Sequence, residues 1–172
     1  HVDDKAPLSR SQHGFCVGHS TTSNLLFTDA CIAVYVNQGR PYDLVTFDFR
    51  RAFDKVPHSR MPEALSHIGL HLTSLRRFQS FFTSRTQCVV IGRAHSDPAC
   101  VMLGVIQGSV VGKVMFSIFI NPLLKKLDQL LPNSVFCYAD DVKFVIGVTE
   151  ADYAAAKAAI LELFMWAKDN GM

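Results

Sequence analysis

The sequence VFCYADDVKFVI, residues 135–146, places two adjacent aspartates between two apolar runs rich in β-branched and aromatic residues. Such runs are typical of β-strands, and a short acidic step between them is typical of a hairpin turn. We therefore expect two antiparallel strands with Asp140 and Asp141 at their tip. Adjacent carboxylates repel each other, and a divalent cation would relieve that repulsion. Considered without the rest of the chain, the pair is better explained as a solvated acidic turn.

The composition indicates a folded protein. The chain has 172 residues, of which 49% are hydrophobic and 19% charged, so we expect one domain or part of a larger one. A net charge of +2 permits a nucleic-acid partner without arguing for one. Five cysteines without C-x-x-C spacing favour reduced thiols in an intracellular protein. No apolar run reaches the ~18–20 residues of a transmembrane helix, no signal peptide is visible, and we expect no membrane partner.

His67 and His71 are four residues apart, but Gly69 separates them and the sequence offers no third ligand. We therefore do not expect a metal site there. The chain starts without Met and stops directly after an expected helix, so we expect it to be part of a longer polypeptide.

The first half of the chain alternates helical and extended patterns. Ser20 or Thr21 is a suitable cap for a helix that runs to about residue 37. The β-branched and aromatic residues within 43–49 predict a strand with Asp48 near its end. A buried carboxylate is costly unless it is paired or bound to metal, and Asp48 could equally cap the turn that follows. We expect a turn over 50–56.

Short elements follow. We expect a helix over 60–67 capped by Ser59, a helix from 73 or 74 to 83, strands over 86–91 and 99–103, and a polar loop over 93–98. Three arginines near the second helix could contact phosphates, but a charged solvent face is the more common meaning: Arg76, Arg77 and Arg85.

The second half of the chain is more apolar. A glycine-bearing loop, 104–109, precedes a segment at 110–131 that is too apolar for the surface and so predicts a buried helix, kinked or broken at Pro122. Thr149 caps a last helix over 150–169. The expected buried face of that helix consists of Tyr153, Ala156, Ile160, Leu163, Phe164 and Ala167.

This order of elements predicts an α+β fold, an antiparallel sheet with helices on one face. Such a sheet could bring Asp48 beside the hairpin tip with Asp140 and Asp141. Three carboxylates that meet there would suit two divalent ions about 3.5–4 Å apart.

Four blocks of sequence, spread over nearly the whole chain, resemble the reverse transcriptase domain of non-LTR (LINE-type) retrotransposons. They are QHGFCVGHSTTSNLL at 12–26, FDFRRAFDKVPH at 47–58, GVIQGSVVGKVMFSIFINPL at 104–123 and YADD at 138–141. The resemblance implies the palm of a right-hand-shaped polymerase with interleaved fingers segments. It divides the chain at about 1–40 (fingers side), 41–58 (palm), 59–98 (fingers insert) and 99–172 (palm).

By this resemblance the catalytic residues are acidic. Asp48 and Asp140 match the principal metal ligands, Asp141 matches the neighbouring acid, and the carbonyl of Phe49 matches a backbone ligand of the metal.

The nucleotide site is implied in the same way. The amides of Arg51 and Ala52 match those that hold the triphosphate, and Gln107 and Gly108 match the loop beside the incoming nucleotide and template. Phe53 matches the bulky residue under the sugar, where a ring would clash with a 2′-hydroxyl. Without the resemblance, Phe53 is better explained as a core residue.

The resemblance implies an RNA-directed DNA polymerase, which uses two Mg²⁺ ions, or Mn²⁺ in their place, to join dNTPs to a DNA primer on an RNA template. It also implies an intracellular location in cytoplasm and nucleus, and further fingers and thumb regions in the parent polypeptide, which an endonuclease region often accompanies in this family.

Four positions depart from the family pattern. Cys16 and His19 stand where arginine is usual, and Ile106 and Lys113 stand where proline is usual. These departures favour an alternative, a catalytically inactive remnant or a nucleic-acid-binding module. An RNA-templated RNA polymerase shares the palm chemistry, but Phe53 and the YADD sequence argue against it.

Overall fold

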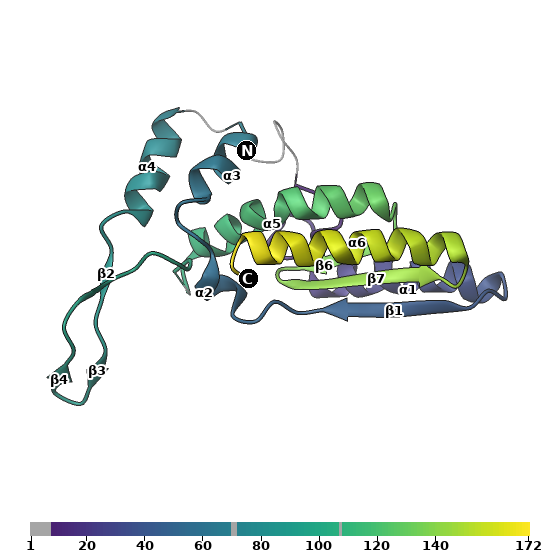
Figure 1. The fold of residues 1–172 in the computed structure, drawn as a ribbon, viewed down its shortest axis with the longest axis horizontal. Helices are drawn as coiled ribbons and strands as arrows, with labels where there is room; N and C mark the ends of the chain where they lie inside the picture. Colours follow the sequence, from purple (N-terminus) through teal and green to yellow (C-terminus); the bar gives the residue numbers. More distant parts are fainter. Residues whose placement is uncertain (1–7, 70–71, 107) are drawn as a thin grey trace.

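The structure is a computed structural model, and it describes residues 8–69, 72–106 and 108–172 (Figure 1). In chain order its elements are α1 (Thr21–Asn37), β1 (Tyr42–Phe47), α2 (Ala52–Lys55), α3 (Met61–His67), α4 (Leu72–Phe82), β2 (Thr86–Gln87), β3 (Val90–Ile91), β4 (Ala94–His95), β5 (Ala99–Cys100), α5 (Val110–Leu130), β6 (Val135–Tyr138), β7 (Asp141–Gly147) and α6 (Glu150–Asp169).

The central sheet has three antiparallel strands in the order β1-β7-β6. β6 and β7 form the predicted hairpin, paired from Val135 opposite Phe144 to Tyr138 opposite Asp141. β1 pairs with the other edge of β7 and ends at Phe47 opposite Val142. The predicted strand over 43–49 is therefore confirmed in place but ends earlier, so that Asp48 lies just beyond it.

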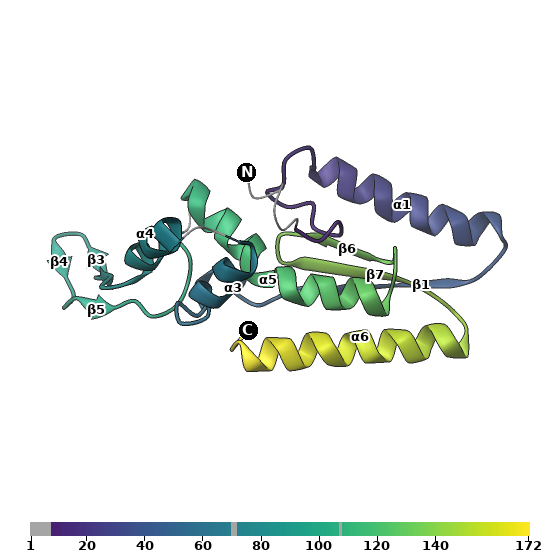
Figure 2. The same cartoon turned by 90° about the horizontal axis from the view of Figure 1, so that it is seen from above.

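Helices cover both faces of this sheet, whereas we expected them on one face. Figure 2 shows α1 on one side and α5 and α6 on the other. On β7, Val142 and Phe144 pack into the core with α5 and α6, while Lys143 points to α1 and its Nζ lies 3.5 Å from Asn24 Oδ1. Because Val145 is also fully buried, the second face of the sheet needs its own cover.

α5 is the buried helix that the sequence predicts. It runs through Pro122 to Leu130, so of the two predicted alternatives the break into two helices is wrong. The helix axis bends along its length (Figure 2), which agrees with the other alternative, a kink. Proline removes one backbone hydrogen bond, and full burial of Leu123 and Leu124 beside it keeps the two halves packed as one helix.

α6 has a narrower buried face than predicted. Ala156, Ala159 and Leu163 are buried against the core, but Tyr153 is 46% and Phe164 59% exposed. Small alanines let the helix lie close to α5 and β7, which leaves the larger rings at the edge of the contact. The Tyr153 hydroxyl instead donates to Asp43 at 2.9 Å.

The residues between β1 and α5 form an arm that extends beyond the sheet (Figure 1). The expected turn over 50–56 contains α2, the expected loop over 93–98 contains β4, and the predicted strand over 86–91 is split in two. α3 starts from Arg60 without a side-chain cap, so the prediction of Ser59 as the cap is wrong. His71 lies outside the described residues, and no described helix is long and apolar enough to cross a membrane.

Candidate active site

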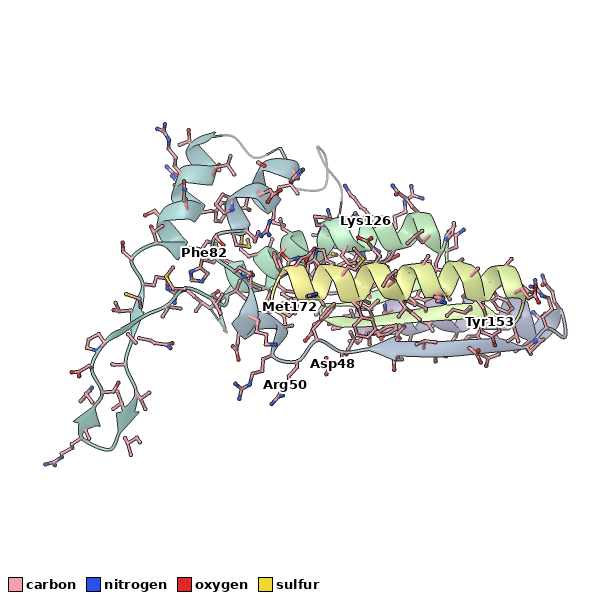
Figure 3. All side chains as sticks on the ribbon, in the orientation of Figure 1. Asp48, Arg50, Phe82, Lys126, Tyr153 and Met172 are labelled. Carbon is pink, nitrogen blue, oxygen red and sulfur yellow. The ribbon has the colours of Figure 1, made fainter. Side chains whose placement is uncertain are left out.

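The strand register brings Asp48 to the hairpin. Phe47 is the last paired residue of β1 and lies opposite Val142, so the next residues, Asp48 and Asp141, continue the same alignment. Side chains alternate along strands, which puts both carboxylates on the face that also carries Lys143. Figure 3 shows Asp48 at the end of β1, next to Arg50.

Asp140 occupies the turn between β6 and β7. Partial burial raises the pKa of its carboxyl group, a hydrogen bond from its own backbone counteracts this, and the negative charges of Asp141 and Asp48 raise the pKa further. Asp140 therefore lies in the electric field of both other carboxylates. The three acidic residues meet at one end of the sheet.

The donor chemistry of this site suits a hard divalent cation, because carboxylate and carbonyl oxygens are the ligands that Mg²⁺ prefers. Asp48 and Asp141 are exposed and Asp140 is half-buried, so their side chains can turn towards a shared ion. Within the described residues, however, no three His, Cys, Asp or Glu side chains already form a group that could hold a metal. The backbone of the site is in place, and cation binding would have to draw the side chains together.

The residues after β1 place the implied nucleotide-binding groups next to Asp48. Phe49 is 7% exposed and its ring packs against Trp166, with centroids 5.8 Å apart. Arg51 has a left-handed backbone, with φ of 56°, and starts α2, in which Ala52 is buried. Gly108 also has a positive φ, of 82°, while Gln107 lies outside the described residues.

Phe53 is both a core residue and a surface residue. Its ring lies 4.6 Å from that of Phe116 in the core and 6.2 Å from that of Phe15, and the side chain is half-buried. Phe15 in turn lies 6.3 Å from the ring of Tyr138, and the ammonium group of Lys113 lies 5.3 Å from the centre of the Phe15 ring. An aromatic platform with a cation over it therefore stands between the hairpin and the start of α5.

Sequence reasoning did not anticipate this platform. It treated Lys113 only as a departure from a family pattern and assigned no role to Phe15. The left-handed φ of 59° at Phe15, which positions its ring, is a property of the folded backbone and has no sequence signature at a phenylalanine.

A groove of about 1020 Å³ lies between α1 and the outer side of β6, and its walls include Phe27, Val34 and Phe136 but none of the three aspartates. This groove is therefore separate from the acidic end of the sheet, where Asp48 and Asp141 are exposed.

Comparison with known proteins identifies the family. The profile of the family "Reverse transcriptase (RNA-dependent DNA polymerase)" matches residues 2–172. Two curated relatives are both described as "Retrovirus-related Pol polyprotein from type-1 retrotransposable element R2", from Popillia japonica. One is 27% identical over 71% of this chain, and the other is 25% identical over 66%. The chain spans only 17% and 19% of their lengths.

Two solved structures share the fold. They are the telomerase of Candida albicans, solved with a TWJ fragment of telomeric RNA, and the apo telomerase of Candida tropicalis truncated from its C-terminal domain. Each aligns with a TM-score of 0.63 at 14% identity, over 87% and 88% of this chain and 29% and 32% of those chains. These alignments confirm the predicted fold class, and the family match confirms the resemblance drawn from the four sequence blocks. Because the family profile covers residues 2–172, the chain belongs to the reverse transcriptase family.

Proposed function

We propose that this chain is the palm and part of the fingers of an RNA-directed DNA polymerase. The observation that carries the proposal is the strand register, which aligns Asp48 with Asp141 while Asp140 stands in the field of both. The fingers and palm boundaries that we assign, at about residues 40, 58 and 98, are part of this proposal.

The acidic residues would hold the cofactor. Asp48, Asp140, Asp141 and the carbonyl of Phe49 would bind two Mg²⁺ ions, or Mn²⁺ in their place, and these ions when bound activate the primer 3′-hydroxyl and neutralise the leaving pyrophosphate. Asp48 reaches the site from just beyond β1, Asp141 from the first residue of β7 and Asp140 from the turn, so the sheet fixes the spacing of their backbones.

The neighbouring residues would hold the nucleotide. The amides of Arg51 and Ala52 would donate to the triphosphate, and Gln107 and Gly108 would lie beside the base and the template. Because Phe53 packs on Phe116, its ring cannot easily withdraw when a 2′-hydroxyl is presented to it. We therefore assign Phe53 to the selection of dNTPs over rNTPs.

The distribution of charge supports nucleic-acid partners. Residues 50–113 contain nine lysines and arginines and three acidic residues, a net charge of +6, whereas the rest of the chain has a net charge of −4. The basic part includes most of the arm, and it contributes Phe53 and Lys113 to the aromatic platform. Positive charge concentrated on one part of a protein is typical of phosphate binding. We assign an RNA template and a DNA primer as the partners, together with the fingers, thumb and endonuclease regions of a longer polypeptide that works in cytoplasm and nucleus.

A second function is favoured by one observation. Cys16 and His19 replace two positive charges that the family usually carries. The Cys16 thiol donates to Gly14 O at 3.4 Å, and the His19 ring lies 4.6 Å from the ring of His13. Fewer charges near the triphosphate would weaken nucleotide binding more than template binding. This favours a nucleic-acid-binding module without polymerase activity.

Primer extension tests the proposal. The chain, its Asp140→Asn variant and a matched Glu150→Gln variant are compared on an RNA template with Mg²⁺ or Mn²⁺. Glu150 starts α6 and follows the end of β7 that lies opposite the hairpin tip. We expect incorporation by the chain and by Glu150→Gln, and none by Asp140→Asn. Equal incorporation by all three would overturn the assignment of the site. Salt-sensitive binding of the primer–template without incorporation by any of them would support the binding module.

A further inference from the structure

Residues 11–13 run beside β6 and extend the sheet by a short strip. Gln12 pairs with Cys137 in a parallel bridge, with Cys137 N–H donating to Ser11 O at 2.7 Å and His13 N–H donating to Cys137 O at 2.8 Å. This strip brings the side chain of Gln12, which is 1% exposed, under the tip of the acidic hairpin.

The amide of Gln12 makes four polar contacts there. Its Oε1 accepts from Ala139 N–H at 3.0 Å and from Gly14 N–H at 2.7 Å. Its Nε2 donates to Ala139 O at 3.2 Å and to Cys137 Sγ at 3.3 Å. One side chain therefore binds both backbone polar groups of Ala139, the residue directly before Asp140.

Ala139 needs this support. It has φ of 58°, in the left-handed region, which is unfavourable for a residue with a Cβ atom. It is also 5% exposed, so water cannot readily replace a lost partner of its N–H group. A buried backbone group without a partner is destabilising. Removing the Gln12 amide would thus leave a strained turn without its main hydrogen bonds.

The space around Gly14 shows how closely residues 11–14 approach the turn at Ala139. A Cβ atom added to Gly14 would stand 2.3 Å from Ala139 N and 2.9 Å from Ala139 Cα, so only glycine lets the strip approach the turn this far. Gln12 Oε1 holds Gly14 and Ala139 together, since it accepts from both N–H groups.

From these contacts we propose that Gln12 is a positioning residue that holds the Ala139 turn, and through it the carboxylate of Asp140, in the geometry needed for cation binding. This inference rests on the function proposed above for Asp140. Misplacement of a reacting group by about 1 Å can reduce a rate roughly 100-fold, so a loosened turn should affect turnover strongly.

The test compares Gln12→Met, which keeps the shape but loses the hydrogen bonds, with Ser11→Ala as a matched control. Ser11 is buried in the same strip, but its hydroxyl bonds Asp128 on α5, away from the turn. Three quantities are measured on each folded variant: hydrogen exchange at the Ala139 amide, Mn²⁺ affinity by electron paramagnetic resonance, and kcat and KM for dNTP incorporation.

We expect Gln12→Met to expose the Ala139 amide to exchange, to weaken Mn²⁺ binding, and to lower kcat by about 10–100-fold with KM for dNTP nearly unchanged. Ser11→Ala should lower only stability. Wild-type Ala139 protection and Mn²⁺ affinity in Gln12→Met, or equal losses in Ser11→Ala, would overturn the proposal.

Two further variants keep the outcomes distinct. If Gln12→Met does not fold, Gln12→Glu replaces it, because a carboxylate still accepts from Ala139 but cannot donate to it; unchanged Mn²⁺ affinity and kcat in that variant would also overturn the proposal. Asp140→Asn tests the proposed function itself. If Asp140→Asn binds Mn²⁺ like the wild type while Gln12→Met still exposes the Ala139 amide, the assignment of the metal site fails but the contact between Gln12 and the turn stands.

Discussion

Asp140 carries its carboxyl group where burial and the negative charges of Asp141 and Asp48 oppose ionisation. Its pKa in the folded protein is therefore raised above the ordinary value of 3.8. The unfolded chain ionises first as the pH rises, so it binds fewer protons than the folded chain in this range. It follows that the contribution of Asp140 to stability decreases as the pH rises above about 4.

The Asp140→Asn variant should consequently be more stable than the wild type near neutral pH when divalent cations are removed by a chelator. The melting temperature of both proteins, measured from pH 7.5 downwards, should show a difference that shrinks towards pH 4. Added Mn²⁺ should stabilise only the wild type, since ligands stabilise the state that binds them. A variant that melts below the wild type at pH 7.5 would contradict the repulsion that we describe.

Phe53 gives a second prediction at this scale. In the active polymerase, Phe53→Val should reduce discrimination between dNTPs and rNTPs by roughly 10–100-fold in the ratio of kcat/KM values, because a smaller side chain leaves room for the 2′-hydroxyl. Phe144→Val is the control: its ring is fully buried but packs on Phe47 and not on Phe53, so its loss should lower stability and leave the ratio nearly unchanged. Equal ratios in Phe53→Val and the wild type would mean that Phe53 has only a core role.

Among the elements, the ends of helices follow local chemistry. The side chains of Ser20 and Thr149 each accept a backbone hydrogen bond in the first turn of a helix, as the sequence predicts, and the Ser109 side chain does the same at the start of α5. Ser59 does not cap α3, because the helix starts after Arg60. Pro62 lies in its first turn, where the fixed φ and the missing N–H of proline are tolerated.

At Pro122, tertiary packing overrides the local tendency of proline to end a helix, since α5 continues through it. Proline within a helix costs about 3 kcal/mol relative to alanine, and its side chain is exposed here. Pro122→Ala should therefore raise the free energy of unfolding, by up to about 3 kcal/mol, as measured by urea denaturation. Pro132→Ala, in the loop after α5, should instead be neutral or destabilising by about 0.4–1 kcal/mol. A destabilised Pro122→Ala would show that the bend in α5 is itself required for packing.

On the scale of the whole molecule, the separation of charge predicts how the protein binds nucleic acid. Replacing Arg76, Arg77 and Arg93 in the arm by glutamine should weaken binding to single-stranded RNA and reduce the slope of log K against log salt by up to about 2, if each contacts one phosphate. Replacing Lys125, Lys157 and Lys168 on α5 and α6, which are also exposed, should change the slope little. Binding can be followed by fluorescence anisotropy across a salt series.

If both triple variants reduced the slope equally, binding would depend on net charge and not on the arm. The overall charge of +2 did not indicate this arrangement. Only the division of the charges along the chain, set against the position of the arm in Figure 1, does so.

The sequence by itself determined the local elements of this protein. The hairpin around Asp140, the hydroxyl caps of α1, α5 and α6, and the apolar character of α5 depend on neighbours within a few residues, and such patterns are readable without a fold. The four sequence blocks also identified the family, because each combines residue types that chemistry requires at short spacing.

Tertiary structure alone decided what these elements do together. Residues about a hundred positions apart are joined in four ways: by the order β1-β7-β6, by the register that aligns Asp48 with Asp141, by the packing of α1 on the second face of the sheet, and by the hydrogen bonds between Gln12 and Ala139. Which such pairs form depends on the burial of whole surfaces and on backbone conformations such as the left-handed Ala139, and these are properties of the packed chain.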